Sequence, residues 1–431
     1  MESISSRVNE AARFLEVGEP EEALRLATKE LDAAPDDPVS LYIVGRALLD
    51  LERPGLAQVL CKRAVEVVPN DAALWNNLGH AYQMSFDEKA EEALLNSLRI
   101  NPRSYYALNN LSLVYVNKAQ PDKAIAFAKK ALSIENGLDA VENKAFALLM
   151  KKQWKEGWEG YEIGLGRSKE RKERSYVNPT EPRWNGEKGK TVVAYGEQGL
   201  GDEIAFSSCI PDLMKDVNVI IDCDPRLEGL FSRSFGCPVY GTRYKNDVTW
   251  PSKHKIDSRV AFSSLQKFYR NEFTGEHYLQ PDPWRRRIWR TILDQYPGRK
   301  IGIAWTGGIS KTGQKHRSLG PEVFKDLDGT LISLEYKDIK PVDGVLDFSR
   351  FINTGDYDDT AALVAELDLV VSVTTSIVDL CGAIGQECHV LVPSMPHWRY
   401  GIEGQMPWYK SVKLHRHNKD WKELRANLRR I

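Results

Sequence analysis

The sequence has few cysteines, and no two of them are spaced as C-x-x-C. Its six cysteines lie mostly inside apolar runs, which is typical of reduced thiols and argues against a disulfide framework. No apolar run approaches the ~20 residues that a membrane-spanning helix needs. The first residues show no basic stretch followed by an apolar core, so we expect no secretory signal. These absences predict a soluble protein of the cytoplasm.

An excess of charge of one sign is also missing. The 59 Lys and Arg residues nearly balance the 60 Asp and Glu residues, which gives a formal net charge of −1. Such a balance carries no overall signature of nucleic-acid binding. A length of 431 residues with 42% hydrophobic residues is too much for one ordinary core, so we expect two or three domains.

The two common phosphate-binding glycine patterns are absent from the turn within residues 192–211. A short apolar run, Val192–Tyr195, predicts a strand, and residues 204–210 predict a helix. Between them lie three glycines, Gly196, Gly199 and Gly201. Their spacing, G-x-x-G-x-G-D, fits neither the dinucleotide nor the P-loop pattern. A helix N-terminus favours anions, but Asp202 would repel a phosphate and is better placed as a base or as a holder of hydroxyls. On spacing alone, a functional loop and a plain turn both remain open.

What the sequence does contain is a repeat of 33 or 34 residues over residues 1–165. Prolines recur at Pro35, Pro69 and Pro102, with Asn136 at the next equivalent place. Small residues recur in step, at Ala23, Ala57, Ala90 and Ala124 and at Gly45, Gly79 and Ser112. This is the tetratricopeptide pattern of paired helices, in which a proline follows the second helix. We expect four repeats, beginning near residues 4, 38, 72 and 105, and a degenerate fifth.

The inner, concave face of such an array usually binds a peptide or a partner protein. Asparagines recur on the predicted first helices of the repeats, at Asn76, Asn77, Asn109 and Asn110. Their amides could bond an extended peptide backbone, but polar residues that only pack helices together would show the same spacing. Recruitment of a partner or acceptor and a purely scaffolding or dimer-forming role therefore both remain open.

Residues 166–189 are charged and rich in helix breakers, as expected of a linker or of an extended segment on a domain surface. Strand and helix patterns then alternate to the end of the chain, which predicts parallel sheets. We divide this part into two Rossmann-like halves, residues 190–290 and 291–431. In the second half, Asp359 is the expected N-cap of a helix over Thr360–Leu367, and Cys388–Val392 is the expected last strand. Two such halves in tandem predict a ligand cleft between the C-terminal ends of their strands.

The second half offers its own candidate anion site. Thr374, Thr375 and Ser376 stand where a strand meets a helix N-terminus, which suits a diphosphate. Simple capping of that helix by Thr375 or Ser376 is the alternative. The loop after Trp305 adds four possible cations, Lys311, Lys315, His316 and Arg317. This loop either clamps phosphate oxygens or is merely solvated.

One acidic pair looks like a metal site. Asp222–Cys223–Asp224 is a D-x-D sequence, and carboxylates are ligands that suit manganese. Three residues match by chance often, and this pair directly follows a predicted Rossmann strand. We therefore expect no metal.

Taken together, the chain resembles bacterial and viral tetratricopeptide-repeat proteins with a C-terminal glycosyltransferase-like domain of the GT-B type. These are akin to the heptosyltransferases of lipopolysaccharide synthesis and, more distantly, to the O-linked GlcNAc transferases. The resemblance covers nearly all of the chain. It is carried by a collinear set of segments: Trp154–Tyr161, Pro182–Glu187, Gly196–Asp202, Asp222–Arg226, Gly302–Gly307, Arg317–Ser318, Asp368–Gly385, Trp398–Arg399 and Pro407–Tyr409.

The resemblance implies a role for several residues. Asp202 corresponds to the proposed catalytic base, beside an acceptor-side glycine loop that contains Gln198, Gly199 and Gly201. Donor binding is implied for Trp305, Gly307, Lys315, Arg317, Thr374, Thr375, Ser376 and Asp379. Two positions depart from the family pattern: Thr374 stands in place of an acid, and Asp379 stands in place of a histidine.

The resemblance implies a metal-independent, inverting transfer of a sugar from a nucleotide-sugar co-substrate to an acceptor hydroxyl, with no cofactor. The acceptor is left open among protein, glycan, lipid and modified DNA base. A peptide or protein is the expected partner of the repeat array, and a homo-oligomer is possible. The alternative is a non-catalytic interaction protein with a decayed transferase fold, which the departures at Thr374 and Asp379 would support.

Overall fold

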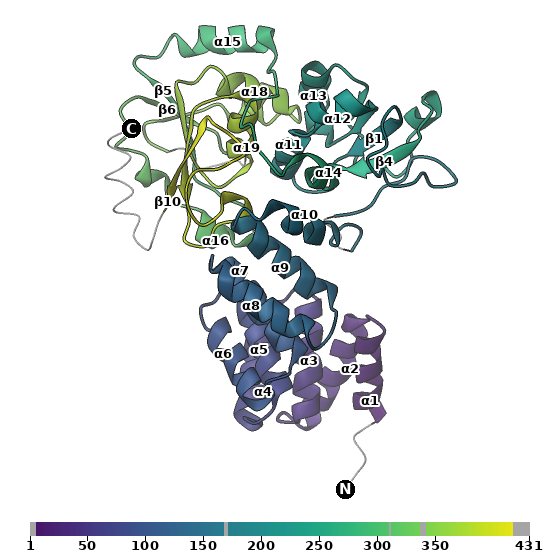
Figure 1. Ribbon diagram of the computed structural model, residues 1–431. Helices are drawn as coiled ribbons and strands as arrows, with labels where there is room; N and C mark the ends of the chain where they lie inside the picture. Colours follow the sequence, from purple (N-terminus) through teal and green to yellow (C-terminus); the bar gives the residue numbers. More distant parts are fainter. Residues whose placement is uncertain (1–5, 168–170, 310–311, 337–341, 417–431) are drawn as a thin grey trace. The chain divides into compact units, whose positions relative to one another are not determined.

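The computed structural model describes residues 6–167, 171–309, 312–336 and 342–416 (Figure 1). The chain forms two compact units, Met1–Ala147 and Leu148–Ile431. The boundary falls inside helix α9 (Leu138–Met150), whereas the repeat pattern places the end of the array at residue 165. Helix α10 (Trp154–Glu162) groups with the second unit because it packs on helix α14 (Phe262–Tyr269) of that unit.

The first unit is an array of helices in which each helix from α1 to α7 packs on the next. In chain order they are α1 (Ser6–Glu16), α2 (Pro20–Ala33), α3 (Pro38–Asp50), α4 (Pro54–Val67), α5 (Ala72–Met84), α6 (Ala90–Ile100), α7 (Tyr105–Asn117), α8 (Pro121–Leu132) and the start of α9. Side chains at the helix starts fix several of these boundaries: Asp37, Asp71 and Ser104 accept hydrogen bonds from N–H groups in the first turn. The predicted helical repeat region is confirmed.

Small residues allow the paired helices of the array to approach closely. A methyl group at Gly45 would lie 2.7 Å from the Sγ of Cys61, and one at Gly79 would lie 2.6 Å from the side chain of Leu94. Because no room is left for a side chain, the repeated small residue is a packing requirement.

The turn between the paired helices uses a left-handed backbone in every repeat. Gly18 has a φ of +79°, and four non-glycine residues at equivalent places have φ between +53° and +59°: Glu52, Phe86, Ala119 and Lys152. For residues other than glycine, this conformation costs about 1–2 kcal/mol of conformational energy. The array therefore holds a small, repeated strain at these turns.

The second unit begins with a four-stranded parallel sheet in the order β3-β2-β1-β4. Its strands are β1 (Thr191–Tyr195), β2 (Asn218–Asp222), β3 (Val239–Tyr240) and β4 (Ser258–Ala261), and its helices are α11 (Leu200–Ser207), α12 (Ile210–Asp216), α13 (Glu228–Phe235) and α14. A short 3₁₀ turn, η1 (Pro225–Leu227), leads into α13. Helix α15 (Pro283–Leu293), capped by Asp282, then leads to the second sheet.

The second sheet has six parallel strands in the order β10-β9-β8-β5-β6-β7. They are β5 (Lys300–Ala304), β6 (Thr330–Ser333), β7 (Val345–Asp347), β8 (Leu369–Val373), β9 (Cys388–Val392) and β10 (Val412–Arg416). The helices among them are α16 (Gln314–Arg317), α17 (Ser349–Ile352), α18 (Tyr357–Val364) and α19 (Ser376–Ile384), and η5 (Trp398–Tyr400) is a 3₁₀ turn. The predicted α/β architecture with parallel sheets is confirmed.

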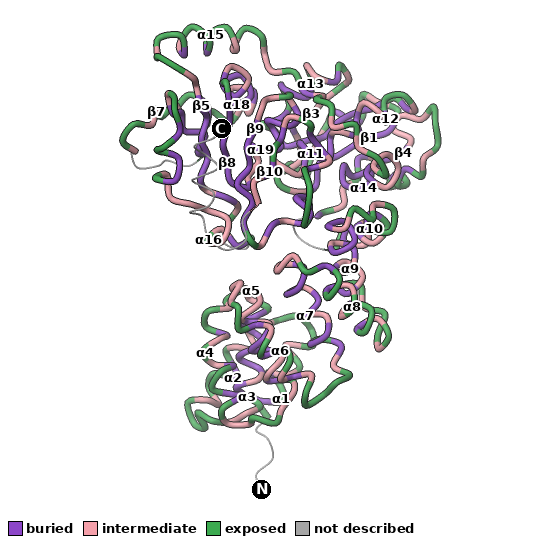
Figure 2. Tube along the Cα trace, turned by 60° about the vertical axis from the view of Figure 1, so that its left-hand side comes forward, coloured by how far each residue is buried: buried purple, intermediate pink, exposed green. Residues whose placement is uncertain are grey.

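The core of the second sheet lies along its central strands. Every residue of β8 and of β9 is buried, and Figure 2 shows these strands as buried segments. A near-continuous apolar run is expected for a parallel strand covered on both faces. The C-terminal ends of β5 and β8 are thereby fixed, and they support the loops described below.

Two details differ from the sequence-based expectations. Strand β9 is not the last strand, because β10 pairs with it in parallel register. Helix α18 begins at Tyr357 and is capped by Asp356, whose side chain accepts from the N–H of Asp358, so Asp359 lies inside the helix. The start of α18 was misplaced because several acidic residues close together could each cap the helix.

The segment expected to be a linker is tied to the first sheet in its described part. The N–H of Trp184 donates to the carbonyl of Arg259 at 2.7 Å, and the N–H of Arg259 donates to the carbonyl of Pro182 at 3.0 Å. Tyr176 is buried as well. This segment therefore runs along the edge of the sheet beside β4.

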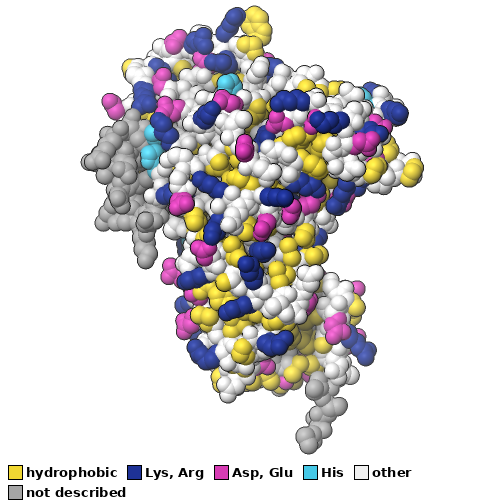
Figure 3. All heavy atoms as spheres, in the orientation of Figure 1, with side chains coloured by type: hydrophobic (Ala, Val, Ile, Leu, Met, Phe, Trp, Pro, Cys, Tyr) yellow, Lys and Arg dark blue, Asp and Glu magenta, His cyan; other side chains and the backbone are white. Residues whose placement is uncertain are grey.

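Within the described ranges, none of the helices combines the length and apolar character needed to cross a lipid bilayer. Over the face shown in Figure 3, basic and acidic side chains are interspersed. This distribution agrees with the near-zero net charge of the sequence.

Candidate functional site

A cavity of about 550 Å³ lies in the second unit, between the N-termini of α11 and α19. Helix α11 contributes Gly201 and Asp202, and η1 contributes Arg226. The second half contributes the larger part of the lining: Gly308, Arg317, Tyr336, Asn353, Asp356, Tyr357, Thr360, Thr375, Ser376, Asp379, His397, Arg399 and Tyr400 among others. Both halves of the second unit therefore supply polar side chains to one space.

The glycine loop is shaped by close packing. A methyl group at Gly196 would lie 2.1 Å from the carboxyl carbon of Glu203, and one at Gly201 would lie 2.7 Å from Oδ2 of Asp379 and 3.2 Å from Cα of Ser376. Gly201 thus lets the first turn of α11 lie against the first turn of α19. Two helix N-termini, each with a partial positive charge, meet at the cavity.

Asp202 lies in the first turn of α11 and is 27% exposed. It does not cap the helix, because the N-cap residue is Gly199. Instead, its carboxylate pairs with Nη1 of Arg399. Nη2 of Arg399 donates to Oδ2 of Asp379 at 3.1 Å. One guanidinium therefore bridges two carboxylates, one from each half.

Asp379 is almost completely buried in the first turn of α19. Burial raises its pKa to about 7, and the Arg399 guanidinium opposes this shift. His397 lies in the same lining, and burial, with Arg399 and Arg317 nearby, holds its pKa well below its usual range. The imidazole is accordingly neutral at pH 7, so the positive charge at this side of the cavity comes from arginine.

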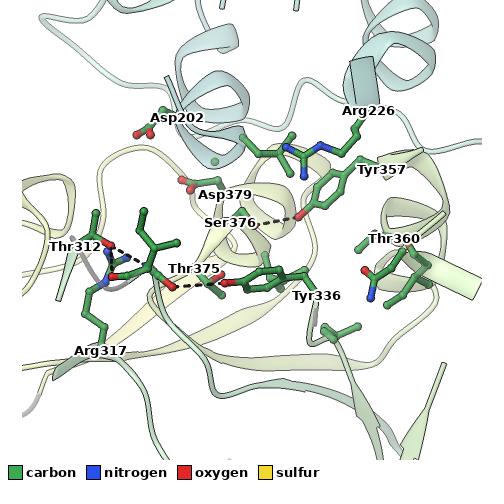
Figure 4. Close-up of a pocket in the computed structure, with 18 of the residues that line it drawn as sticks. Asp202, Arg226, Thr312, Arg317, Tyr336, Tyr357, Thr360, Thr375, Ser376 and Asp379 are labelled. Carbon is green, nitrogen blue, oxygen red and sulfur yellow. Dashed lines mark hydrogen bonds between the residues drawn. The ribbon is translucent and has the colours of Figure 1, made fainter. Parts of the chain in front are cut away.

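The N-terminus of α19 is left without a side-chain cap. Thr375 occupies the N-cap position but makes no capping hydrogen bond. The hydroxyl of Tyr357 donates to Oγ of Ser376 at 3.3 Å, and Figure 4 shows these two side chains pointing toward one another. Capping by either hydroxyl, the alternative left open by the sequence, is therefore not what the structure shows.

Arg317 lines the cavity, but its guanidinium already has protein partners. Nη2 donates to the carbonyl oxygen of Thr374 at 2.6 Å, and Nε donates to Oγ1 of the same residue at 3.2 Å. Thr374 is fully buried and is not part of the lining. Lys315 is exposed on α16 and lies outside the lining, while Lys311 lies outside the described residues.

Other predicted site residues support the cavity from outside it. The N–H of Trp305 donates to Oε1 of Glu335 at 2.7 Å, and the Trp305 ring is part of the core. Gly307 packs against the backbone of Arg317. Gln198 turns away, because its Oε1 accepts a hydrogen bond of 2.9 Å from the hydroxyl of Tyr161 on α10. Of the predicted residues, Gly201, Asp202, Arg317, Thr375, Ser376 and Asp379 come together at the cavity.

Sequence reasoning missed Arg399 and Arg226 as site residues. Both lie in segments that carry the family resemblance. However, no neighbouring residue and no spacing indicated a function for either arginine. Arg226 donates to both carboxylate oxygens of Asp224, at 2.8 and 2.9 Å, and reaches the cavity from η1. Tyr336 and Tyr357 were also not singled out. Isolated tyrosines and arginines have no spacing signal.

The D-x-D sequence has structural partners. Asp222 accepts hydrogen bonds from the hydroxyls of Tyr176 and Thr242 at 2.8 and 2.7 Å, and Asp224 is occupied by Arg226. Across the described part of the chain, no group of three or more His, Cys, Asp or Glu side chains is arranged to hold a metal ion.

In the first unit, the repeated asparagines bond to one another. Nδ2 of Asn110 donates to Oδ1 of Asn76 at 3.0 Å, and Nδ2 of Asn143 donates to Oδ1 of Asn109 at 2.9 Å. Asn77 is buried. These amides connect the first helices of successive repeats, as polar packing residues do, and each still has hydrogen-bonding capacity left.

Comparison with known proteins supports the repeat region. The tetratricopeptide repeat profile matches residues 105–137, which are α7 and α8 with the turn that follows. Protein FlbA of Caulobacter vibrioides is 26% identical over 441 residues, covering 91% of this chain and 72% of FlbA. The chain therefore contains a tetratricopeptide repeat, and it has a relative that is similar along both units.

Solved structures similar to part of the chain include a TPR protein and MamA. A thermophilic TPR protein of Thermus thermophilus is 24% identical, with 38% of this chain and 92% of that chain covered and a TM-score of 0.34. MamA is 28% identical, with 36% and 91% covered and a TM-score of 0.31.

Proposed function

We propose that the second unit is a GT-B glycosyltransferase that uses the cavity to transfer a sugar from a nucleotide-sugar donor to an acceptor hydroxyl. The observation that supports this most directly is the composition of the cavity. Two uncapped helix N-termini and the guanidinium groups of Arg226, Arg317 and Arg399 surround a space of about 550 Å³ that also contains the carboxylate of Asp202. Such positive groups suit a diphosphate without a metal.

In the proposed reaction, Asp202 takes the proton of the acceptor hydroxyl while the acceptor oxygen attacks the anomeric carbon of the donor. The bond between that carbon and the phosphate oxygen breaks, and its electron pair leaves with the nucleoside diphosphate. Attack from the side opposite the leaving group inverts the anomeric centre. Thr375, Ser376 and the arginines stabilise the charge that develops on the leaving phosphate.

The apolar and aromatic part of the lining suits the nucleoside. Leu334, Tyr336 and Ile352 face the cavity together with the polar side chains of Asn353 and Thr360. A pocket that is mainly apolar with a few polar groups is typical of a small-molecule site. We infer that the base and ribose lie here and that the diphosphate lies toward α19.

The repeat array is proposed to recruit the acceptor or a partner protein. Tetratricopeptide arrays bind peptides or proteins on their concave face, and the asparagines of the first helices retain unused hydrogen-bonding groups. The alternative function, a scaffold that carries a decayed transferase fold, has one supporting observation. Asp202, Arg399 and Asp379 already pair with one another, so the charged groups at the cavity have protein partners.

Calorimetry with the full chain and a panel of uridine, guanosine, adenosine and cytidine nucleotide sugars tests the proposal. We expect at least one to bind, and we expect Arg226→Ala to weaken that binding by about 1.5–3 kcal/mol, the usual value of a charged hydrogen bond. Arg287→Ala is the matched control, because Arg287 is exposed on α15 and contacts the ring of Trp284. Absence of binding across the panel would contradict the proposal. Binding without transfer or hydrolysis would favour the scaffold alternative.

A further inference from the structure

The ionic cluster at the cavity joins one arginine to two carboxylates of unequal exposure. The side chain of Asp202 is 27% exposed, that of Arg399 is 8% exposed and that of Asp379 is 2% exposed. Asp202 comes from α11, Asp379 comes from α19 and Arg399 comes from η5. Three separate elements therefore hold this cluster, which we call the Asp–Arg–Asp cluster.

Asp379 lies at the edge of the cavity, and the described partner of its carboxylate is Arg399. Its Oδ2 accepts from Arg399, and its Oδ1 is buried without a hydrogen-bond partner among the described residues. Gly201 covers the carboxyl group closely, since even a methyl group there would lie 2.7 Å from Oδ2. A carboxylate this enclosed has little surface to offer a ligand, although it belongs to the cavity lining, and its effect on the cavity passes chiefly through the guanidinium that it holds.

Resting on the proposed function, in which Asp202 is the base, we propose that Asp379 is a positioning residue that acts on Asp202 through Arg399. Asp379 fixes the guanidinium between the two carboxylates and takes a share of its positive charge. When Asp379 is ionised, Asp202 feels less of that charge and also feels a second negative charge nearby. Both effects make Asp202 a stronger proton acceptor.

When Asp379 is neutral, the whole charge of Arg399 falls on Asp202, which becomes a weaker base. Burial raises the pKa of Asp379 to about 7, so this change of charge falls near neutrality. Asp379 is protonated below that pH, and the proposed turnover is low there. Above that pH, Asp379 is ionised and turnover rises.

The groups around Asp379 support assigning the titration to it. Arg399 opposes its protonation, Asp202 favours it and Arg317 opposes it more weakly. The tyrosines that feel its charge are Tyr278, Tyr357, Tyr400 and Tyr409. The pKa of each tyrosine is raised above its usual value, chiefly by burial, so all four stay neutral around pH 7. Cys381, on the same helix, likewise stays a neutral thiol, because burial raises its pKa.

The test is the pH profile of kcat for Asp379→Asn, measured with the nucleotide sugar that calorimetry selects. We expect kcat of the wild type to rise about tenfold between pH 6 and pH 8 as Asp379 loses its proton. In Asp379→Asn the side chain at position 379 is an amide without charge at any pH. The kcat of this variant should therefore stay near the low-pH value of the wild type. Its affinity for the nucleotide sugar at pH 6 should stay within about twofold of the wild type.

Asp359→Asn is the matched control. Asp359 lies on the neighbouring helix α18, where it pairs with Arg285 at 2.7 Å outside the cavity lining, and its variant should keep the wild-type pH profile. A second variant, Arg399→Lys, keeps the positive charge but cannot bridge both carboxylates, and it should lose the same rise.

Retention of the wild-type rise in Asp379→Asn or in Arg399→Lys would overturn the inference while leaving the proposed function intact. A wild type that binds nucleotide sugars but neither transfers nor hydrolyses them would instead overturn the proposed function, and the inference with it. Loss of nucleotide-sugar affinity in Asp379→Asn would show that Asp379 serves binding, which also contradicts a role through Asp202.

Discussion

At the scale of single residues, Asp202 has a structural partner and a proposed chemical role that one substitution separates. Asp202→Asn keeps an oxygen that accepts from Arg399 and removes the ability to take a proton. We expect the variant to fold with a near-native Tm and to bind donor, while turnover falls by ~10²–10⁴-fold, the usual contribution of a positioned base. Thermal unfolding, calorimetry and a transfer assay give the three measurements.

Wild-type turnover in Asp202→Asn would place the base elsewhere. Its neighbour Glu203 is a poor substitute, because its carboxylate accepts from the N–H of Asp224 at 2.8 Å and pairs with Arg243 inside the first half. It is 1% exposed and lies outside the cavity lining.

Glu203 gives a second prediction, on stability. Burial raises its pKa to about 8, and Arg243 and the N–H of Asp224 oppose this shift. The unfolded chain releases this proton near pH 4.3, so between about pH 4.5 and 8 the folded state holds more protons. The wild type therefore loses stability relative to Glu203→Gln as the pH rises through this window, by on the order of 1 kcal/mol per pH unit.

Urea denaturation of both proteins at pH 5, 6 and 7 measures this difference directly. The comparison with Glu203→Gln isolates Glu203 from Asp379, which titrates in both proteins. A constant difference between the two proteins over this range would show that Glu203 stays ionised in the fold.

At the scale of elements, the turns of the array offer a matched pair of substitutions. Ala119 adopts a φ of +53° between α7 and α8, and Gly18 adopts +79° between α1 and α2. Ala119→Gly relieves about 1–2 kcal/mol of backbone strain in the folded state. It also destabilises the folded state by about 0.5–1 kcal/mol, because glycine makes the unfolded chain more flexible. We expect a net gain in stability of roughly 0.5–1 kcal/mol.

The reverse substitution, Gly18→Ala, should lower stability by a similar amount. No atom lies within 4 Å of a methyl group at Gly18, so backbone strain alone would cause the loss. Amide hydrogen exchange of α1, α2, α7 and α8 measures both effects locally. A destabilised Ala119→Gly would mean that the side chain of Ala119 contributes more than its backbone costs.

Most elements of this fold could be predicted because each has a local signal. The 33- and 34-residue spacing indicated the paired helices, and an apolar run indicated β9 at its observed bounds. Strand β10 was missed because it follows a long irregular stretch and only part of it is buried. The start of α18 was misplaced because Asp356, Asp358 and Asp359 are all possible caps.

The candidate site was less predictable, because its key contacts join distant positions. Asp202 and Arg399 are 197 residues apart, and no spacing rule connects them. From the sequence, Asp379 was only a departure from the family pattern, because its partner Arg399 lies in a distant segment. Arg399, which offsets the charge of Asp379, comes close to it only in the folded structure, where η5 lies near α19.

At the scale of the whole molecule, the chain combines a helical array with an α/β unit, and the similarity to FlbA covers 91% of it. That share exceeds either unit, so the relative resembles both of them. The proposed function assigns a separate task to each unit: recognition of an acceptor or partner to the array, and chemistry to the cavity. Separate tasks predict that substitutions in one unit change one activity and spare the other.

The double variant Asn76→Ala, Asn109→Ala tests this division in the full chain. Each asparagine accepts one hydrogen bond from the next repeat, so some loss of array stability is expected. Transfer of labelled sugar to the macromolecular fraction of the source cell should fall at least tenfold, because the amides that we propose to bind an extended peptide are gone. Hydrolysis of the same nucleotide sugar by water should stay at the wild-type rate, because the cavity lies wholly in the second unit.

Lys129→Ala is the control for this experiment. Lys129 is exposed on α8, the second helix of its repeat, and its loss should leave both activities unchanged.

The single variants distinguish a binding role from mere loss of stability. If Asn76→Ala and Asn109→Ala each weaken transfer while circular dichroism shows an intact array, the amides contact the acceptor. Undiminished transfer by the double variant would mean that the asparagines serve only to pack the repeats and that the acceptor is recognised elsewhere.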